Sequence, residues 1–260
     1  MRAAAARLLR PLLPSLLALL AGCAGLQAPE ARFDGPITAQ TVDAFLARVG
    51  DAPVRRLVVN SPGGDTLAGM RLGAWVHRAA ADVEVDTRCG SACANYVFTA
   101  GARKRIRPGA IVYWHGSSEQ RDFRERNARW FALERRAAAG EALAGPERDF
   151  LERNRALVAA SERARAAQRA LFRDLGVAEY LTRAGQEPFA VGAAWTYSAE
   201  DLKRFGVCDV EAPEGYAGHV QLEALRAAGT PVVRLALDDA ILARLAAELA
   251  SLDYRIRDCP

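Results

Sequence analysis

The stretch VRRLVVNSPGGDTLAGM, residues 54–70, decides the fold of this chain. Its first seven residues predict a strand, which runs directly into SPGGD, residues 61–65. A helix is expected to follow over about 66–80. Gly63 and Gly64 let the backbone turn sharply between the two elements. They also leave N–H groups exposed at the start of a helix, where such groups bind anions and oxyanions.

The segments around this stretch alternate between helix and strand at short spacing. Before it, residues 38–49 predict an amphipathic helix that begins near Thr38. After it, further strands are expected at residues 83–87 and 110–116. This order with short connections is typical of an α/β domain whose strands pair in parallel. A chain of 260 residues is long enough for one substantial core with an appended subdomain.

The stretch VDTRCGSACANYVFTAG, residues 85–101, places Ser91 directly after a strand and at the start of a helical segment. Two interpretations are open. The Ser91 hydroxyl can cap the helix, or the residue can lie at the tip of a tight turn, exposed as a nucleophile. A serine nucleophile needs a base within hydrogen-bond reach, and His115, at the end of a later strand, is the best candidate. His77 is expected within a helix and His219 after a glycine-rich loop.

The N-terminal segment is typical of an exported lipoprotein. Residues 1–22 carry three arginines, no acid and an apolar run too short to span a bilayer as a mature helix. LAGC, residues 20–23, resembles the lipobox of bacterial lipoproteins, in which the signal peptidase cuts before the cysteine and Cys23 is lipidated. Ala24 resembles the pattern that directs export to the outer membrane. We therefore expect a lipoprotein signal peptide at 1–22, a tether at 23–32 and a lipid-anchored location in the bacterial envelope, on the outer membrane facing the periplasm.

The net charge and the cysteine content argue against two classes of function, nucleic-acid binding and metal binding. From position 23 onwards the chain has 32 basic and 31 acidic residues, a net charge of +1, which gives no electrostatic footprint for nucleic acid. Four cysteines remain besides Cys23, and an even number in an oxidising compartment predicts two disulfides with three possible pairings. A metal site is disfavoured because no C-x-x-C pair is present and the three histidines are scattered, and no cofactor is expected. The candidates for the disulfides are Cys89, Cys93, Cys208 and Cys259.

Residues 119–185 have a different composition, rich in arginine, glutamate and alanine. They predict two long helices broken near 139–147, with Pro146 at or near the start of the second. Interleaved charges usually mark a solvated helix face. Self-association of the chain into a homo-oligomer through this helical arm is the alternative. Residues 213–260 predict a C-terminal extension with a strand and a helix from Asp238.

Together, these motifs resemble the proteolytic subunit of the Clp protease and its wider Clp/crotonase superfamily. FDGPIT, VVNSPGGDTLAGM, SACANYVFTAGARKRIRPGAIVYWHG and SAEDLKRFGVCD follow one another in the order of the family. The resemblance implies an α/β fold of the ββα superhelix type with a long α-helical insertion, its core formed by residues 33–118 and 186–212. It also implies a catalytic set, consisting of the nucleophile Ser91, the base His115 and an oxyanion site at Gly63 and Gly64.

Two departures from the family pattern bear on activity. Aligned without a gap from TAG, residues 99–101, the serine of the family falls on Ala92. One residue must therefore be accommodated in the turn or the helix for Ser91 to act. The acidic third member of the family's triad falls near Ala190, and the nearest acid is Glu187. Without an orienting carboxylate, a histidine base loses orders of magnitude in rate.

Two functions remain open from the sequence. The first is a serine hydrolase, most simply a peptidase that uses Ser91 and His115 on peptides or proteins of the envelope. The second is a non-catalytic relative, a lipid-anchored protein that keeps the fold for binding or assembly. Acyl-CoA chemistry of the crotonase kind is disfavoured, because an exported lipoprotein does not meet coenzyme A.

Overall fold

The computed structural model describes residues 29–260 apart from 120–124, 126, 187–190 and 192. The predicted signal peptide and Cys23, the predicted lipidation site, lie outside these residues. Within them, no helix combines the length and the apolar character needed to cross a bilayer. The helices are α1 (Ala39–Val49), α2 (Thr66–Arg78), η1 (Cys93–Phe98), α4 (Ala128–Ala138), α5 (Gly145–Leu175), η2 (Glu179–Thr182), α6 (Ala199–Lys203), α7 (His219–Ala227) and α8 (Asp239–Ala250). The strands are β1 (Glu30–Asp34), β2 (Arg56–Ser61), β3 (Asp82–Gly90), β4 (Lys104–Ile106), β5 (Ile111–Tyr113), β6 (Ala194–Thr196), β7 (Val210–Glu211) and β8 (Val232–Arg234).

The main sheet has six strands, in the order β1-β2-β3-β4-β7, with β5 paired to β3. All of its pairs are parallel, which confirms the α/β class predicted from the alternation of strands and helices. β4 pairs with the first half of β3, where Val83 lies opposite Lys104, and β5 pairs with the last residues of β3, where Gly90 lies opposite Tyr113. The carboxyl ends of β2, β3 and β5 are therefore neighbours.

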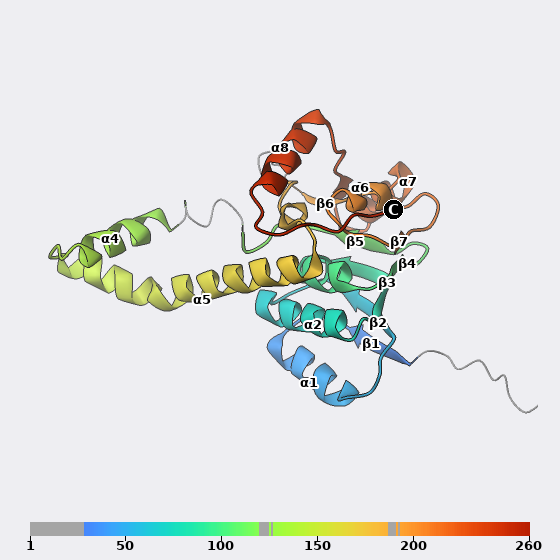
Figure 1. The fold of residues 1–260 in the computed structure, drawn as a ribbon, viewed down its shortest axis with the longest axis horizontal. Coiled ribbons are helices and arrows are strands. Elements are labelled where there is room, and N and C mark those ends of the chain that lie inside the picture. The colour runs from blue at the N-terminus through green and yellow to red at the C-terminus, as the bar shows by residue number, and fades with distance from the viewer. Residues whose placement is uncertain (1–28, 120–124, 126, 187–190, 192) are drawn as a thin grey trace, which may run out of the picture.

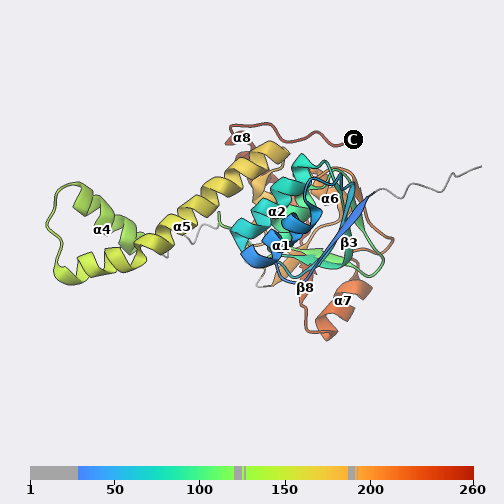
Figure 2. The ribbon, with the colours of Figure 1, turned by 90° about the horizontal axis from the view of Figure 1, so that it is seen from below.

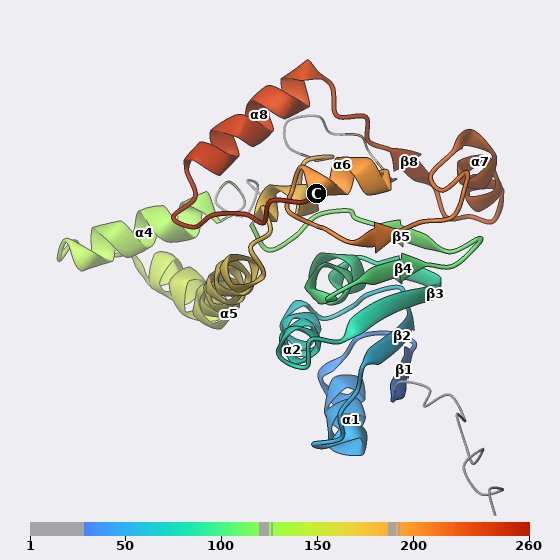
Figure 3. The ribbon, with the colours of Figure 1, turned by 45° about the vertical axis from the view of Figure 1, so that its right-hand side comes forward.

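Helices α1, α2 and η1 lie on one face of this sheet (Figure 3). α1 begins where the sequence predicts, because the Thr38 hydroxyl accepts a hydrogen bond from the Thr41 N–H at 3.1 Å. α2 begins in the same way, with the Asp65 carboxylate accepting from the Ala68 N–H at 2.7 Å. Their apolar sides and the strands beneath them form the main core, which includes Phe45.

Strand β1 begins within the segment predicted as a tether, residues 23–32. Its sequence, EARFD, carries three charged residues, and only Phe33 is fully buried. It is an edge strand, held by backbone pairing with β2 along its whole length. Charged side chains are usual on edge strands, so hydrophobic patterning gives no signal for this element.

Helix α5 extends from the core to the tip of an arm that it forms with α4 (Figures 1 and 2). The predicted pair of helices is confirmed, with Pro146 in the first turn of α5. α5 ends earlier than the predicted 185, because Gly176 adopts a left-handed conformation with φ 61°. Its last turns pack into the main core through Phe172 and Leu175. The arm has a small core of its own, formed by Trp130, Leu133, Leu143, Leu151 and Val158.

The C-terminal region joins the main sheet at the end of β5. Trp114 exchanges two backbone hydrogen bonds with Trp195 of β6, each with an N–O distance of 2.8 Å. β6 pairs in parallel with β8 in a second sheet. The predicted C-terminal strand and helix are confirmed as β8 and α8, and Asp238 caps α8. α7 is not predicted from the sequence, and none of its residues is buried.

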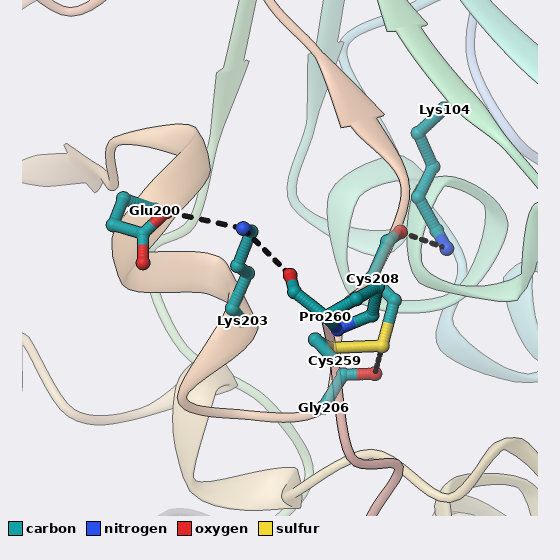
Figure 4. The surroundings of a disulfide bond; sticks show 7 residues. All are labelled: Lys104, Glu200, Lys203, Gly206, Cys208, Cys259 and Pro260. Carbon is teal, nitrogen blue, oxygen red and sulfur yellow. Dashed lines mark hydrogen bonds and ion pairs between the residues drawn. A yellow bond between two sulfur atoms is a disulfide. The ribbon is translucent and has the colours of Figure 1, made fainter.

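The cysteines form two disulfides, Cys89–Cys93 and Cys208–Cys259. This is one of the three pairings that the sequence left open. Disulfides of this kind persist mainly in oxidising compartments. The second disulfide ties the tail that follows α8 to the segment before β7 (Figure 4).

Lys104 lies beside this second disulfide, and it is almost completely buried (Figure 4). Its Nζ donates a hydrogen bond to the Cys208 carbonyl at 2.9 Å. No carboxylate lies within ion-pair distance of it among the described residues. Burial, together with the positive charge of Arg257, lowers the pKa of Lys104 from 10.5 to about 8.

The lowered pKa predicts how stability changes with pH. Between about pH 8 and pH 10.5 the unfolded chain keeps the proton on Lys104 and the folded chain does not, so the free energy of unfolding rises with pH. The rise is expected to be roughly 3–4 kcal/mol, because the pKa falls from 10.5 to about 8 and a tenfold change in proton affinity corresponds to about 1.4 kcal/mol. Urea unfolding at several pH values should show it as a difference between the unsubstituted chain and Lys104→Met.

The other lysine of the chain supplies the control. Lys203 is partly exposed, pairs with Glu200 at 3.3 Å and donates to the Pro260 carbonyl. The Lys203→Met variant should therefore keep the rise. Parallel stability curves for the unsubstituted chain and Lys104→Met would contradict the prediction.

Candidate active site

Three neighbouring strands of the main sheet end where the sequence predicts functional residues. β2 ends two residues before Gly63, β3 ends directly before Ser91, and β5 ends two residues before His115. The carboxyl ends of parallel strands open on one edge of a sheet, where α/β proteins usually place their binding sites. The structure therefore brings all three predicted segments to the same edge.

Gly63 packs directly against the turn that holds Ser91. Its φ is 93°, and a Cβ added there would lie 2.6 Å from the Ser91 Cβ and 2.9 Å from the Ala92 nitrogen. The Gly63 N–H donates to the Ser61 hydroxyl at 3.1 Å, so this predicted oxyanion donor is already engaged within the chain. The Gly64 N–H makes no hydrogen bond within the described residues. One of the two predicted donors is therefore available for a ligand.

Ser91 occupies a strained turn between β3 and the helix that follows. Its φ is 53°, in the left-handed region, which costs a non-glycine residue about 1–2 kcal/mol. Its N–H donates to the Tyr113 carbonyl at 3.0 Å, and its carbonyl accepts from the Asn95 N–H at 2.8 Å. The hydroxyl makes no hydrogen bond to any described residue, so it does not cap the helix. Nucleophilic serines of other folds are held in comparable strained strand-to-helix turns.

The helix after Ser91 contains the π-helical turn η1, whose six residues are all buried. A π-helix bonds each residue to the fifth one along, so it encloses one residue more than an α-helix does. This turn lies between Ser91 and the TAG sequence at 99–101. That is the interval in which one additional residue has to be accommodated for Ser91 to match the serine of the Clp family.

The Cys89–Cys93 disulfide encloses Ser91. It joins the last residues of β3 to the first turn of the helix, and both cysteines are fully buried. Neither sulfur is therefore accessible to a substrate, and the bond fixes the chain on both sides of the serine.

His115 has a well-held backbone and an exposed side chain. Its carbonyl accepts from the Gln186 amide, and the next carbonyl, that of Gly116, accepts from Asn95 Nδ2 at 2.9 Å. Among the described residues no hydrogen bond joins the imidazole to Ser91. The structure thus places the His115 backbone beside the Ser91 helix without the contact that proton transfer needs. Such contacts often tighten only when substrate binds.

The predicted third member of the triad lies outside the described residues, both at Ala190 and at its substitute Glu187. One buried acid near the His115 segment is Glu179, which the sequence analysis missed. Its carboxylate accepts from the Ser117 hydroxyl at 3.0 Å and from Gln168 Nε2 at 2.7 Å.

Glu179 belongs to a buried polar network rather than to an open site. Burial raises its pKa, and the neighbouring Arg183, whose Nε lies 3.0 Å from the carboxylate, opposes that shift. Gln168 also accepts from the Tyr96 hydroxyl at 2.6 Å, which connects the network to η1. The network joins the root of α5, the Ser91 helix and the segment after His115. No local sequence signal marks it, because its members lie far apart in the chain.

The residues that the structure describes hold no group of three or more His, Cys, Asp or Glu side chains able to bind a metal ion. The residues converging at the carboxyl edge of the sheet are thus a serine, a histidine and a glycine-rich loop. No model of a known protein family matches this chain, and no curated protein matches it in sequence.

Proposed function

We propose that this protein is a serine hydrolase, most simply a peptidase, built on the ββα superhelix of the Clp/crotonase type. One observation carries the proposal: the segments bearing Gly63, Ser91 and His115 follow the carboxyl ends of three neighbouring parallel strands. The strained φ of Ser91 and its unbonded hydroxyl support the role of nucleophile. The π-helical turn supports the match to the family, since a π-helix can accommodate one residue more than an α-helix in the interval where the alignment differs by one.

The proposed reaction is acyl transfer through a covalent intermediate. His115 turns toward Ser91 and takes the hydroxyl proton while Oγ attacks the carbonyl carbon of the bound peptide. The Gly64 N–H stabilises the negative charge that develops on the carbonyl oxygen. His115 then gives the proton to the leaving amine, and an acyl ester on Ser91 remains. Water, deprotonated by His115, hydrolyses the ester and restores the serine.

The proposed place of action is the bacterial envelope, with the chain anchored by lipid on Cys23 and acting on peptides or proteins. The lipobox-like sequence and the two disulfides support this location. Self-association through the α4–α5 arm belongs to the same proposal. It is supported by the extension of the arm away from the core (Figure 2). The exposed apolar residue Leu157 of α5 supports it too.

Two observations favour the second candidate, a non-catalytic envelope protein that uses the same fold for binding or assembly. The Gly63 N–H is engaged by the Ser61 hydroxyl, and His115 is exposed without a hydrogen bond to Ser91 among the described residues. In that protein the strained turn and its disulfide would serve rigidity alone.

Covalent labelling by a fluorophosphonate probe separates the two candidates. An activated serine attacks the phosphorus, an Oγ–P bond forms and fluoride leaves. We expect the unsubstituted chain to be labelled and Ser91→Ala to lose labelling completely, because it lacks the Oγ that bonds to phosphorus. His115→Ala should be labelled about 100-fold or more slowly, the usual size of a general-base effect.

Matched variants guard against indirect effects. Ser161→Ala removes an exposed hydroxyl on α5, and His219→Ala removes the histidine at the start of α7. Both should be labelled at the unsubstituted rate. An unlabelled chain that is folded and disulfide-bonded would overturn the hydrolase proposal and leave the non-catalytic function.

A further inference from the structure

The side chain of Asn95 has an acceptor atom that the fold does not use. The residue is only 3 % exposed, and its Oδ1 is buried without a hydrogen-bond partner. Its Nδ2 donates to the Gly116 carbonyl at 2.9 Å, which fixes the orientation of the amide, because Oδ1 cannot donate to a carbonyl. Leaving a buried acceptor unpaired costs about 1–3 kcal/mol. Native proteins seldom accept this cost without a use for the atom.

Asn95 lies between the proposed nucleophile and the proposed base. Its N–H bonds to the Ser91 carbonyl at 2.8 Å, so it stands one turn beyond Ser91 on the same helix. Its side chain reaches the peptide unit directly after His115. It therefore connects these two segments directly, through its backbone N–H on one side and its side-chain amide on the other.

The backbone around His115 is held at several points. Before it, Trp114 is paired with Trp195 through two hydrogen bonds of 2.8 Å. After it, Gly116 is held by Asn95, and the Ser117 hydroxyl is held by Glu179. The imidazole can therefore reach Ser91 only by rotation about its own side-chain bonds. A group that stabilises one such rotamer would set the geometry of the base.

We propose that Asn95 Oδ1 accepts a hydrogen bond from a ring N–H of His115 when the imidazole turns toward Ser91. This bond would leave the other ring nitrogen unprotonated and directed at the Ser91 hydroxyl. Asn95 is then the positioning residue of the site, in the place that a carboxylate holds in most serine hydrolases. An amide serves in the same way in cysteine–histidine–asparagine sites. The inference rests on the proposed function, because it takes His115 as the base.

Two other buried polar atoms lack partners among the described residues, but neither fits this role. Trp114 Nε1 is a donor only and cannot accept the imidazole N–H. Asn60 Oδ1 lies on β2, and β3 separates that strand from β5. Two strand spacings amount to about 10 Å, beyond the reach of a hydrogen bond.

The proposed hydrogen bond between Asn95 and His115 can be tested through the pKa of His115. This pKa is measured by NMR on the full chain labelled with ¹⁵N-histidine. The chain has three histidines, so a His115→Gln variant assigns the signal. Asn95→Asp would place a negative charge against the imidazolium and should raise the pKa of His115 by one unit or more, a tenfold change. The signals of His77 and His219 should not move.

Asn60→Asp is the matched control, because it adds the same charge at another asparagine whose Oδ1 is buried and unpaired. It should shift His115 by less than a third as much. An unchanged His115 pKa in folded Asn95→Asp, or an equal shift in both variants, would overturn the inference. If Asn95→Asp does not fold, the inference is tested instead by measuring the tautomer of neutral His115 in the unsubstituted chain. A single dominant tautomer supports the contact, and the mixture typical of a solvated imidazole overturns it.

The outcome is distinct from that of the labelling experiment. A raised pKa in an unlabelled chain would keep the Asn95 contact and remove the hydrolase. Labelling without a pKa change would keep the hydrolase and remove Asn95 from its site.

Discussion

Replacing Gly63 by alanine is expected to lower the free energy of unfolding by about 4 kcal/mol and to abolish labelling of Ser91. The methyl group would fall 2.6 Å from the Ser91 Cβ and 2.9 Å from the Ala92 nitrogen, and would also overlap the Gly90 carbonyl. A positive φ costs alanine about 1–2 kcal/mol, and overpacking a rigid contact adds about 1–3 kcal/mol. The atoms that it meets are mostly backbone, fixed by a disulfide and by β3, so they cannot rotate away.

Gly109→Ala isolates the packing part of this effect. Gly109 also has a positive φ, 80°, but a Cβ there would meet nothing within 4 Å. Only the conformational cost applies, so a loss of about 1–2 kcal/mol is expected, with labelling unchanged. Urea unfolding followed by tryptophan fluorescence measures both variants. Equal losses of unfolding free energy in Gly63→Ala and Gly109→Ala would contradict this prediction. They would show that the Ser91 turn moves to accommodate the added methyl group and is not rigid.

Removing the Cys208–Cys259 disulfide is the second large effect. The bond closes a loop with a sequence separation of 51, for which the chain-entropy relation gives about 4 kcal/mol. The tail that it anchors also contributes contacts, since the Arg257 N–H bonds to the Gly176 carbonyl at 2.7 Å. The Tyr254 hydroxyl bonds to the Val177 carbonyl at 2.9 Å. Cys208→Ala/Cys259→Ala should therefore shift the urea midpoint and expose the Arg257 N–H to hydrogen exchange.

The other disulfide provides the comparison. Cys89 and Cys93 are only four positions apart, and the same relation gives about 2 kcal/mol for that loop. Cys89→Ala/Cys93→Ala should thus lose about half as much stability, while its effect on labelling should be the larger, because it frees the turn of Ser91. If Cys208→Ala/Cys259→Ala lost less stability than Cys89→Ala/Cys93→Ala, the argument that the longer closed loop gives the larger stabilisation would be refuted.

Local signals account for the parts of the fold that were predicted. The Thr38 hydroxyl and the apolar face at Val42 and Phe45 define α1 without help from the rest of the chain. Pro146 marks the start of α5 for a similarly local reason, since proline is accepted in the first turn of a helix. The turns at Gly63 and Ser91, just after the ends of β2 and β3, follow from the alternation of strand and helix signals.

The parts that were missed depend on tertiary contacts. β1 has a charged sequence, and it forms a strand because its backbone pairs with that of β2. Glu179 becomes a buried acid only when α5 brings Gln168 beside the segment after His115. Asn95 has a weak local signal, as the one amide in the apolar run ACANYVF, but its acceptor is seen to be unpaired only once the packing is known.

The left-handed backbone at Ser91 has a consequence for how this position changes over generations. Glycine would adopt φ 53° without the steric cost that a side chain brings. A Ser91→Gly substitution would therefore be expected to stabilise the fold, and a chain that does not use the hydroxyl would gain stability from it. Retaining serine at this φ therefore gives up about 1–2 kcal/mol of stability relative to glycine.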